Sequence, residues 1–276
     1  MTANNTDAAI AETRPVALIL GATGGIGGAV AEKLLANGYT VRAMHRNAAA
    51  QASRAPHFDW VGGDAMNRED VVRAAEGVEL IVHAVNPPGY RNWSTLVVPM
   101  IDNTIAAARD SGARILMPGN VYNFAPETFD DLTEDSPQHP RTPKGRIRVE
   151  LEQRLAAAAG NGTQVILLRA GDFFGPGTGG NWFGDVVVKK GQPVKAVTNP
   201  ADPGIGHQWV YLPDMAETMV RLVARADELS SFARFHMEGV WDRDGLQLAH
   251  AIRRVTGKPD LPVKRFPWWG VRLASP

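Results

Sequence analysis

Short apolar runs and helix-like patterns alternate along the first two thirds of the chain. The run at residues 16–20 is apolar throughout, and the run at 80–84 is apolar apart from one histidine. Runs of this length are typical of strands that are buried on both faces of a parallel sheet. Strands are predicted at residues 16–20, 40–44, 59–61, 80–84, 115–117 and 164–169.

Apolar residues at helical spacing fill the intervals between these runs. Helices are predicted at residues 26–37, 68–76, 93–111 and 146–159, and glycines at 38 and 77 mark two helix ends. Strict alternation of strand and helix predicts an α/β fold. Because crossovers between parallel strands are right-handed, the expected architecture is a doubly wound, Rossmann-type parallel sheet.

The pattern becomes less regular after residue 170, with short strands and two helices at 213–225 and 245–256. We therefore predict a flexible tail over residues 1–14 and a dinucleotide-binding domain over 15–170. Residues 171–276 are expected to form a smaller, mainly substrate-binding lobe, with strand and helix returns to the core.

Composition narrows the classes of partner. Lys and Arg number 29, Asp and Glu also number 29, and cysteine is absent. The balanced charge argues against a nucleic-acid partner, and the lack of cysteine excludes disulfides, thiolate nucleophiles and Cys-type zinc sites. No metal site is predicted. No apolar run reaches the roughly 18 residues of a membrane span, and no leader pattern is visible, so a cytoplasmic protein is expected.

The strongest motif is the glycine-rich turn at residues 21–28, GATGGIGG, between the first strand and the first helix. Glycines allow a tight turn and close backbone approach, and the helix N-terminus offers N–H groups to phosphates. The turn predicts a bound dinucleotide pyrophosphate. The predicted cofactor contacts are Gly21, Thr23, Gly24, Gly25, Ile26 and Gly27, with Ala84 and Val85 at the end of the fourth strand.

The spacing G-x-x-G-x-x-G resembles that of the extended and atypical short-chain dehydrogenase/reductase superfamily, which includes NAD-dependent epimerase/dehydratase proteins. Asp64 resembles the adenine-contacting acid of these proteins, and Asn103 resembles their helix asparagine. The segments at 168–177 (LRAGDFFGPG) and 208–216 (QWVYLPDMA) are similar to two further landmarks. The resemblance covers nearly the whole chain after residue 15 and implies a nicotinamide cofactor and a small-molecule substrate.

Cofactor preference is indicated by the second strand. Proteins that prefer NAD place an acid at its end for the ribose 2′-hydroxyl, but residues 40–46 contain none. Arg42 and Arg46 are instead suited to a 2′-phosphate. NADP(H) is therefore predicted, with NAD(H) as the alternative.

The superfamily's usual chemistry, which uses Y-x-x-x-K and an upstream Ser or Thr, is not intact. Pro118 occupies the hydroxyl position, and Asn120 is the nearest polar residue. Members of the superfamily often have a glutamate four residues after the lysine of this motif. If Glu150 is that glutamate, Arg146 takes the place of the lysine and Thr142 that of the tyrosine. Threonine is too weak an acid to replace a tuned phenol, and arginine cannot exchange a proton, so Arg146 is expected to bind the cofactor.

Other side chains could supply the proton. Tyr122, after the fifth strand, is the preferred candidate, although packing is an alternative role; Tyr90 lies in the loop after the fourth strand. His139 and His207 are further candidates because histidine titrates near neutrality. Asp172, Trp182 and His207 are predicted to contact substrate. Aromatic residues around Trp182 and Trp268 suggest a pocket wall or, alternatively, packing within the lobe.

Two functions remain open. The first is an NAD(P)(H)-dependent oxidoreductase, or epimerase/dehydratase-like enzyme, acting on a small carbonyl or hydroxyl compound. The second is a non-catalytic NADP(H)-binding redox sensor, which the missing Tyr, Lys and Ser favour. A homodimer is left open, because the sequence does not fix the oligomeric state.

Overall fold

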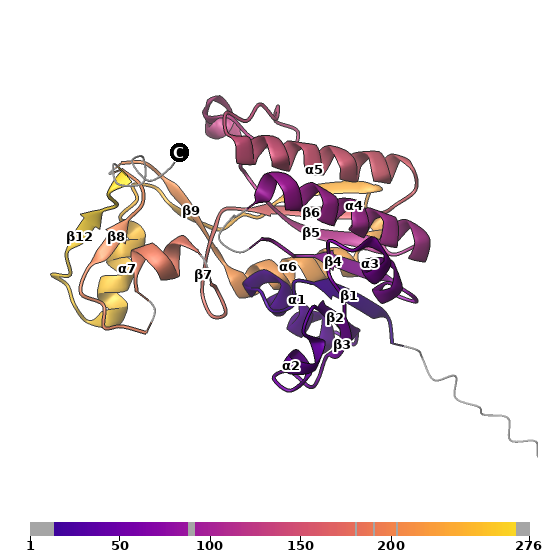
Figure 1. Cartoon of the computed structure of the whole chain (residues 1–276). Coiled ribbons are helices and arrows are strands. Elements are labelled where there is room, and N and C mark those ends of the chain that lie inside the picture. The colour runs from indigo at the N-terminus through magenta and orange to yellow at the C-terminus, as the bar shows by residue number, and fades with distance from the viewer. Residues whose placement is uncertain (1–13, 88–91, 180, 190, 203, 269–276) are drawn as a thin grey trace, which may run out of the picture.

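A seven-stranded parallel sheet forms the centre of the computed structural model, which describes residues 14–87, 92–179, 181–189, 191–202 and 204–268 (Figure 1). Its spatial order is β10 (Phe232–His236), β6 (Val165–Ala170), β5 (Arg114–Asn120), β4 (Leu80–His83), β1 (Val16–Leu20), β2 (Thr40–His45) and β3 (Asp59–Gly62). The order reverses between β1 and β4, which is where ligands bind in such sheets. The predicted Rossmann-type fold is confirmed.

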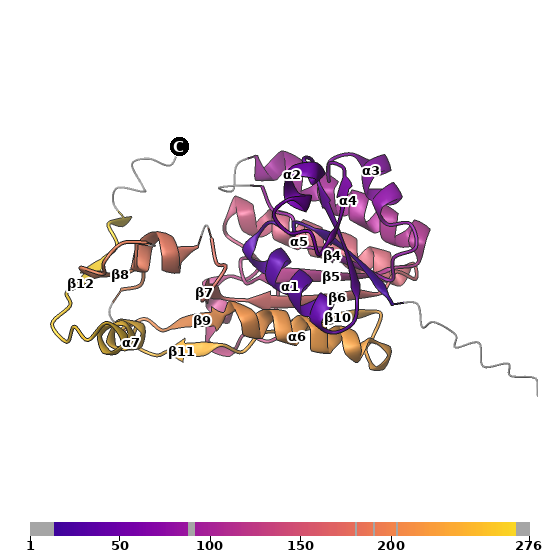
Figure 2. The same cartoon turned by 90° about the horizontal axis from the view of Figure 1, so that it is seen from below.

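Helices cover both faces of the sheet because each strand presents apolar side chains in both directions. On one face lie α3 (Arg68–Ala74), α4 (Trp93–Ser111) and α5 (Pro143–Gly160). On the other face lie α1 (Gly25–Ala36) and α6 (Leu212–Ala224), which also pack against each other. Figures 1 and 2 show the two helical layers on either side of the sheet. The described helices include none that is long and apolar enough to span a membrane.

The lobe that follows β6 contains two small sheets. One has the order β11 (Val240–Asp242), β9 (His207–Tyr211) and β7 (Asp172–Phe174), and the other pairs β12 (Val263–Arg265) with β8 (Val197–Asn199). A π-helical turn (Phe183–Val187) and α7 (Gln247–Thr256) complete it. Strand β10 and helix α6 belong to the central domain, as the predicted returns to the core require.

Three local features differ from the sequence prediction. A short helix α2 (Ala48–Ala52) follows β2, and β7 lies inside the expected glycine-rich loop. Strand β5 continues past residue 117 despite Pro118. It pairs with β4 only as far as Leu116, whereas its pairing with β6 runs on to Asn120. Beyond Leu116 it is therefore an edge on the β4 side, where a residue without an N–H is tolerated. Short 3₁₀ turns at Pro126–Asp131 and Ala226–Glu228 complete the chain.

Candidate dinucleotide site

The glycine-rich turn lies directly against the end of β4. Gly21 has φ +98°, and a Cβ there would lie 2.6 Å from the carbonyl oxygen of Ala84 and 2.8 Å from the amide nitrogen of Val85. A Cβ at Gly27 would lie 2.2 Å from the carbonyl oxygen of Gly21. Glycine is therefore required at both positions. The predicted cofactor residues Ala84 and Val85 are brought beside the turn.

The N-terminus of α1 has no side-chain cap. Gly24 caps the helix without a side-chain hydrogen bond, and the Gly24 N–H donates to the carbonyl of Gly21 at 2.9 Å. Helix N-terminal N–H groups and the helix dipole favour phosphate at such a position. The loop after β7 closes over it, since a Cβ at Gly25 would lie 3.0 Å from the carbonyl oxygen of Gly177. Gly177 was not among the predicted cofactor-binding residues.

Arg42 is placed away from this site, which contradicts its predicted role. Its Nη1 donates to the carbonyls of Ala74 and Glu76, both at 2.8 Å, and its Nε donates to Asp59 at 3.3 Å. The side chain alternates with those of Val41 and Ala43 and so points to the α3 face. Arg42 therefore stabilises the C-terminal end of α3.

A cavity of about 400 Å³ lies beyond the end of β2. Thr23, His45 and Arg54 line it, together with Glu32 of α1 and the Trp60 ring of β3. The Glu32 carboxylate accepts a hydrogen bond from Nε2 of His57 at 2.8 Å. Sequence reasoning did not single out Arg54, because α2 and the turn after it, which contains Arg54, were not predicted.

Arg46 and Asp64 lie close to the carboxyl ends of β2 and β3. Arg46 directly follows β2 and is exposed. The Asp64 carboxylate accepts a hydrogen bond from the N–H of Met66 at 3.0 Å, and Asn103 donates to the carbonyl of Ala65 at 2.9 Å. These contacts fix the loop after β3, and the adenine contact of Asp64 stays a prediction.

Helix α5 corrects the register predicted from Glu150. Thr142 is the N-cap, and its hydroxyl accepts the Gly145 N–H at 3.0 Å. Arg146 is exposed, and its Nη1 reaches only the carbonyl of Arg141, at 3.5 Å. Neither residue points to the sheet. The roles predicted for both are therefore not supported by their placement.

The inward face of α5 carries Arg148 instead. Its guanidinium carbon lies 4.8 Å from the centroid of the Trp93 ring, at the start of α4. One turn later Glu152 is buried against the sheet, whereas Glu150 is exposed. If Glu152 rather than Glu150 is the glutamate that follows the lysine position, Arg148 falls at that position and Lys144 at the tyrosine position, and this register stays a prediction. Helical spacing of Gly145, Arg148, Glu152 and Leu155 was the signal that could have shown the inward face.

A buried ionic network supports this edge of the sheet. Arg169 is fully buried and donates to both Glu152 oxygens, at 3.0 and 2.6 Å. Its Nη1 also lies 2.9 Å from Nε2 of His236, whose pKa is lowered by burial and by the Arg169 charge. Glu134, from the Pro-rich segment, accepts the His236 N–H at 2.8 Å, and this bond is the main reason that the pKa of Glu134 is lowered. The network holds the Pro-rich segment and α5 in place.

His83, the last residue of β4, is buried beside this face. Its Nδ1 lies 2.8 Å from the Thr104 hydroxyl, which donates to the carbonyl of Met100 at 3.1 Å. Since that hydroxyl proton is used, Nδ1 of His83 must carry the hydrogen. Burial first, and the positive charge of Arg148 second, lower the pKa of His83 to about 3.

His83 should make stability depend on pH. The pKa of histidine in the unfolded chain is about 6.5. Below that pH the unfolded chain therefore binds a proton at His83, whereas the native protein does not until the pH approaches 3. The contribution of neutral His83 to the free energy of unfolding is fully present above pH 6.5, and it is lost progressively as the pH drops towards 3. Between pH 7 and 5 the expected loss is about 2 kcal/mol. Urea unfolding at both pH values checks this against His83→Asn, whose amide can still donate to Thr104. An equal loss in the variant would contradict it.

The candidate proton donors occupy different surroundings. Asn120 ends β5, and its Oδ1 accepts the Tyr122 N–H at 3.0 Å. The Tyr122 side chain is 38% exposed, close to the start of α5, and its proposed acid role stays a prediction. His139 is exposed in the Pro-rich segment, and Tyr90 lies outside the described residues.

The structure brings together two of the predicted substrate contacts. Nε2 of His207 lies 2.9 Å from Oδ2 of Asp172, although the residues are 35 positions apart. Trp182 lies elsewhere, with its ring 5.2 Å from that of Phe266 and 5.3 Å from that of Trp268. Packing within the lobe, the alternative considered for these rings, therefore describes Trp182.

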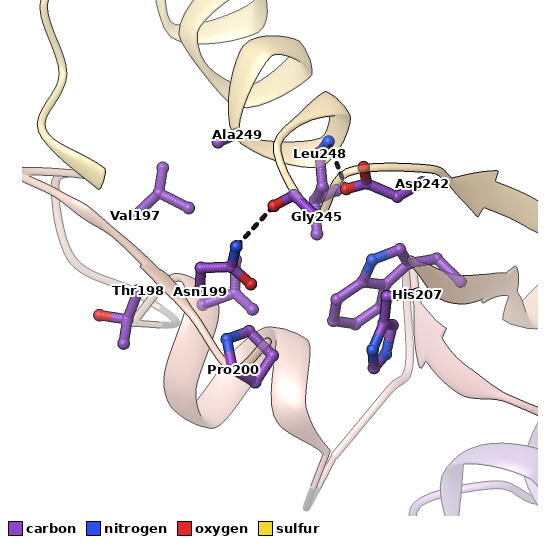
Figure 3. A pocket seen from close by; sticks show the side chains of 11 residues that line it. Val197, Thr198, Asn199, Pro200, His207, Asp242, Gly245, Leu248 and Ala249 are labelled. Atoms are coloured by element: carbon purple, nitrogen blue, oxygen red, sulfur yellow. Dashed lines mark hydrogen bonds between the residues drawn. The ribbon is translucent and has the colours of Figure 1, made fainter. Parts of the chain in front are cut away.

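A small cavity adjoins His207 inside the lobe (Figure 3). Its floor is fixed by Asn199, whose Nδ2 donates to the carbonyl of Gly245 at 2.6 Å, and by Asp242, which accepts the Leu248 N–H at 3.0 Å. The volume is about 10 Å³, enough for about one water molecule. This cavity is therefore no substrate pocket.

Comparison with known proteins agrees with the geometry of the glycine-rich turn. The profile of the "NAD dependent epimerase/dehydratase family" matches residues 17–235. The chain belongs to this family. The family name gives the cofactor class, a nicotinamide dinucleotide, and the turn, the α1 N-terminus and the end of β4 fit such a molecule.

Individual members of the family match over shorter stretches. Protein y4nL of Sinorhizobium fredii is 30% identical over 183 residues, which is 59% of this chain and 51% of that protein. The sterol-4-alpha-carboxylate 3-dehydrogenase, decarboxylating, of Mus musculus is 32% identical over 125 residues, or 43% of this chain and 34% of the enzyme. The matches thus span about half and a third of these relatives' lengths.

A solved structure with the same fold is the UDP-glucuronic acid 4-epimerase of Bacillus cereus, in complex with UDP-glucuronic acid and NAD. The TM-score is 0.77 and the identity 16%, over 91% of this chain and 86% of the epimerase. At this identity the similarity establishes the shared fold, including the lobe after β6.

Proposed function

We propose that this member of the family is an oxidoreductase of the short-chain dehydrogenase type, which uses NADP(H) on a small carbonyl or hydroxyl compound. The observation that carries the proposal is the glycine-rich turn, packed on the end of β4 with the uncapped N-terminus of α1 above it. The dehydrogenase activity in the name of the mouse relative supports the reaction class.

Preference for NADP(H) is supported by the cavity beyond β2. No carboxylate stands at the end of that strand, where His45 and Arg46 follow one another. Arg54, in the turn after α2, lines the cavity together with Thr23. An arginine in this cavity suits a 2′-phosphate. Glu32 is the opposing charge, but it is engaged with His57.

Arg54→Ala should weaken NADPH binding about 10-fold or more and leave NADH binding nearly unchanged. A charge-assisted hydrogen bond contributes roughly 1.5–3 kcal/mol to binding. Because Arg54 is exposed, its contribution should lie at the low end of this range. Isothermal calorimetry with both dinucleotides measures this. Arg109→Ala, at the far end of α4, is the matched control. Equal losses of affinity for NADPH and NADH would show that the cavity does not bind the 2′-phosphate. Tighter binding of NADH than of NADPH by the wild-type protein would show that NAD(H) is the preferred cofactor.

A redox sensor is the second candidate, because no tyrosine occupies α5 at the register set by Glu152. Consumption of NADPH over a panel of aldehydes and ketones separates the two functions. Turnover assigns the enzyme. Tight NADPH binding without turnover assigns the sensor.

A further inference from the structure

The reaction proposed above needs a proton donor and acceptor that α5 does not supply. With Glu152 as the marker of its register, Lys144 and Arg148 stand where the superfamily has Tyr and Lys, and β5 has Pro118 at the hydroxyl position. His83 is buried, with its Nδ1 engaged by Thr104. Besides Tyr122, the candidates for proton transfer therefore lie on other elements, among them those of the substrate side.

Asp172 and His207 share one face of the small sheet. Parallel pairing sets Asp172 opposite Trp209 and Phe174 opposite Tyr211. Because side chains alternate along a strand, His207 lies on the same face as Trp209, diagonally across from Asp172. The 2.9 Å contact between Nε2 and Oδ2 follows from this register. Figure 3 shows the His207 ring among the side chains that line the small cavity. The centroid of this ring lies 4.4 Å from that of the Trp209 ring.

We propose that Asp172 and His207 form the proton-transfer pair of this enzyme; the inference rests on the oxidoreductase function proposed above. A carboxylate can only accept from Nε2, so the Asp172 contact selects the tautomer with hydrogen on Nε2 and a lone pair on Nδ1. Within the described part of the chain, nothing hydrogen-bonds Nδ1. The His207 side chain is a quarter exposed.

The pair lies at the edge of the sheet where the cofactor is expected. Asn120, at the end of β5, is the register partner of Ala170, at the end of β6, and Asp172 is only two residues further on. From there β7 leads to the loop that closes on Gly25 of the glycine-rich turn. Figure 1 shows β7 and β9 between the central sheet and the rest of the lobe.

No second charge competes for His207 on its own sheet. Asp242 pairs with His207 across β9 and β11, but its two oxygens accept the N–H groups of Gln247 and Leu248, both at 3.0 Å. The other side chains on the shared face are apolar or aromatic: Phe174, Trp209, Tyr211 and Val240. Apolar surroundings strengthen the interaction of the one carboxylate with the imidazole.

The step balances without another reactant. A bound nicotinamide dinucleotide would supply the hydride acceptor for oxidation of a secondary alcohol, and Nδ1 of His207 would accept the hydroxyl proton. A carbonyl forms, and Asp172 balances the positive charge on the imidazolium. In reduction, the same nitrogen returns the proton to the carbonyl oxygen as hydride arrives.

Turnover of a defined probe tests the role. With NADPH and 9,10-phenanthrenequinone, His207→Gln should lower kcat by about 100-fold or more, since general acid–base groups typically contribute 10²–10⁴. The Kd for NADPH should stay within about twofold, and 50 mM imidazole should restore His207→Ala by about 10-fold. Asp172→Asn should lower kcat as well. His250→Gln, on the exposed side of α7, is the matched control.

A measurement without cofactor tests the pairing itself. Diethyl pyrocarbonate labelling, followed by mass spectrometry, should modify His207 at least about threefold more slowly in Asp172→Asn, with His250 as internal reference. Equal labelling rates would overturn the pairing. Full kcat in His207→Gln, or a larger loss in Tyr122→Phe, would overturn the proton role and leave the oxidoreductase intact. Wild type that binds NADPH without reducing the quinone would overturn both proposals.

Discussion

Gly24→Val is expected to abolish dinucleotide binding in a chain that still folds. A Cβ at Gly24 would meet only the carbonyl oxygen of Gly21, at 3.3 Å, and the backbone is extended with φ −85° and ψ 167°. A β-branched residue fits that conformation. Its methyl groups would, however, occupy the space above the α1 N-terminus, where the pyrophosphate should approach the backbone.

The expected loss of affinity is at least about 100-fold, because two or more charge-assisted hydrogen bonds of roughly 1.5–3 kcal/mol each would be blocked. Titration of tryptophan fluorescence with NADPH measures the affinity, and far-ultraviolet circular dichroism checks the fold. Gly160→Val is the matched control, since a Cβ there meets nothing within 4 Å. Binding within about threefold of wild type would remove the turn from the cofactor site.

The largest effect on stability is expected from Arg169→Met. This change leaves the Glu152 carboxylate, whose side chain is 6% exposed, without its bidentate partner. Removing one member of a buried ion pair typically costs about 3–5 kcal/mol, because the remaining charge is neither hydrated nor compensated. The free energy of unfolding in urea should fall by that amount.

Two comparisons separate loss of the pair from loss of packing. The double variant Arg169→Met with Glu152→Leu should lose less than the sum of the single changes, because no uncompensated charge remains. Arg225→Met removes an exposed pair with Glu228 and should leave the unfolding midpoint unchanged. If Arg169→Met behaves like Arg225→Met, the buried network contributes nothing to stability.

The sequence alone was sufficient for the features that depend on local pattern. Continuous apolar runs, glycine spacing and helix-ending residues act over a few positions, so the Rossmann-type sheet and the glycine-rich turn were predicted correctly. The close packing of Gly21 and Gly27 follows from the same turn. Thr142 followed by Pro143 is a local signal for the start of a helix that the prediction did not use: α5 begins at Pro143, whereas the predicted helix began at residue 146.

Only the tertiary structure decided which side chains meet. Arg42 lies on β2 and Arg46 directly follows it, and the side chain of Arg42 points to the C-terminal end of α3 and donates to its carbonyl groups. Glu150 and Glu152 are both acids on one helix, and burial against Arg169 selects Glu152, which moves the inward arginine from 146 to 148. Asp172 and His207 meet through the register of β7 and β9. Each of these outcomes depends on pairing between elements distant in sequence, which no local pattern of residues contains.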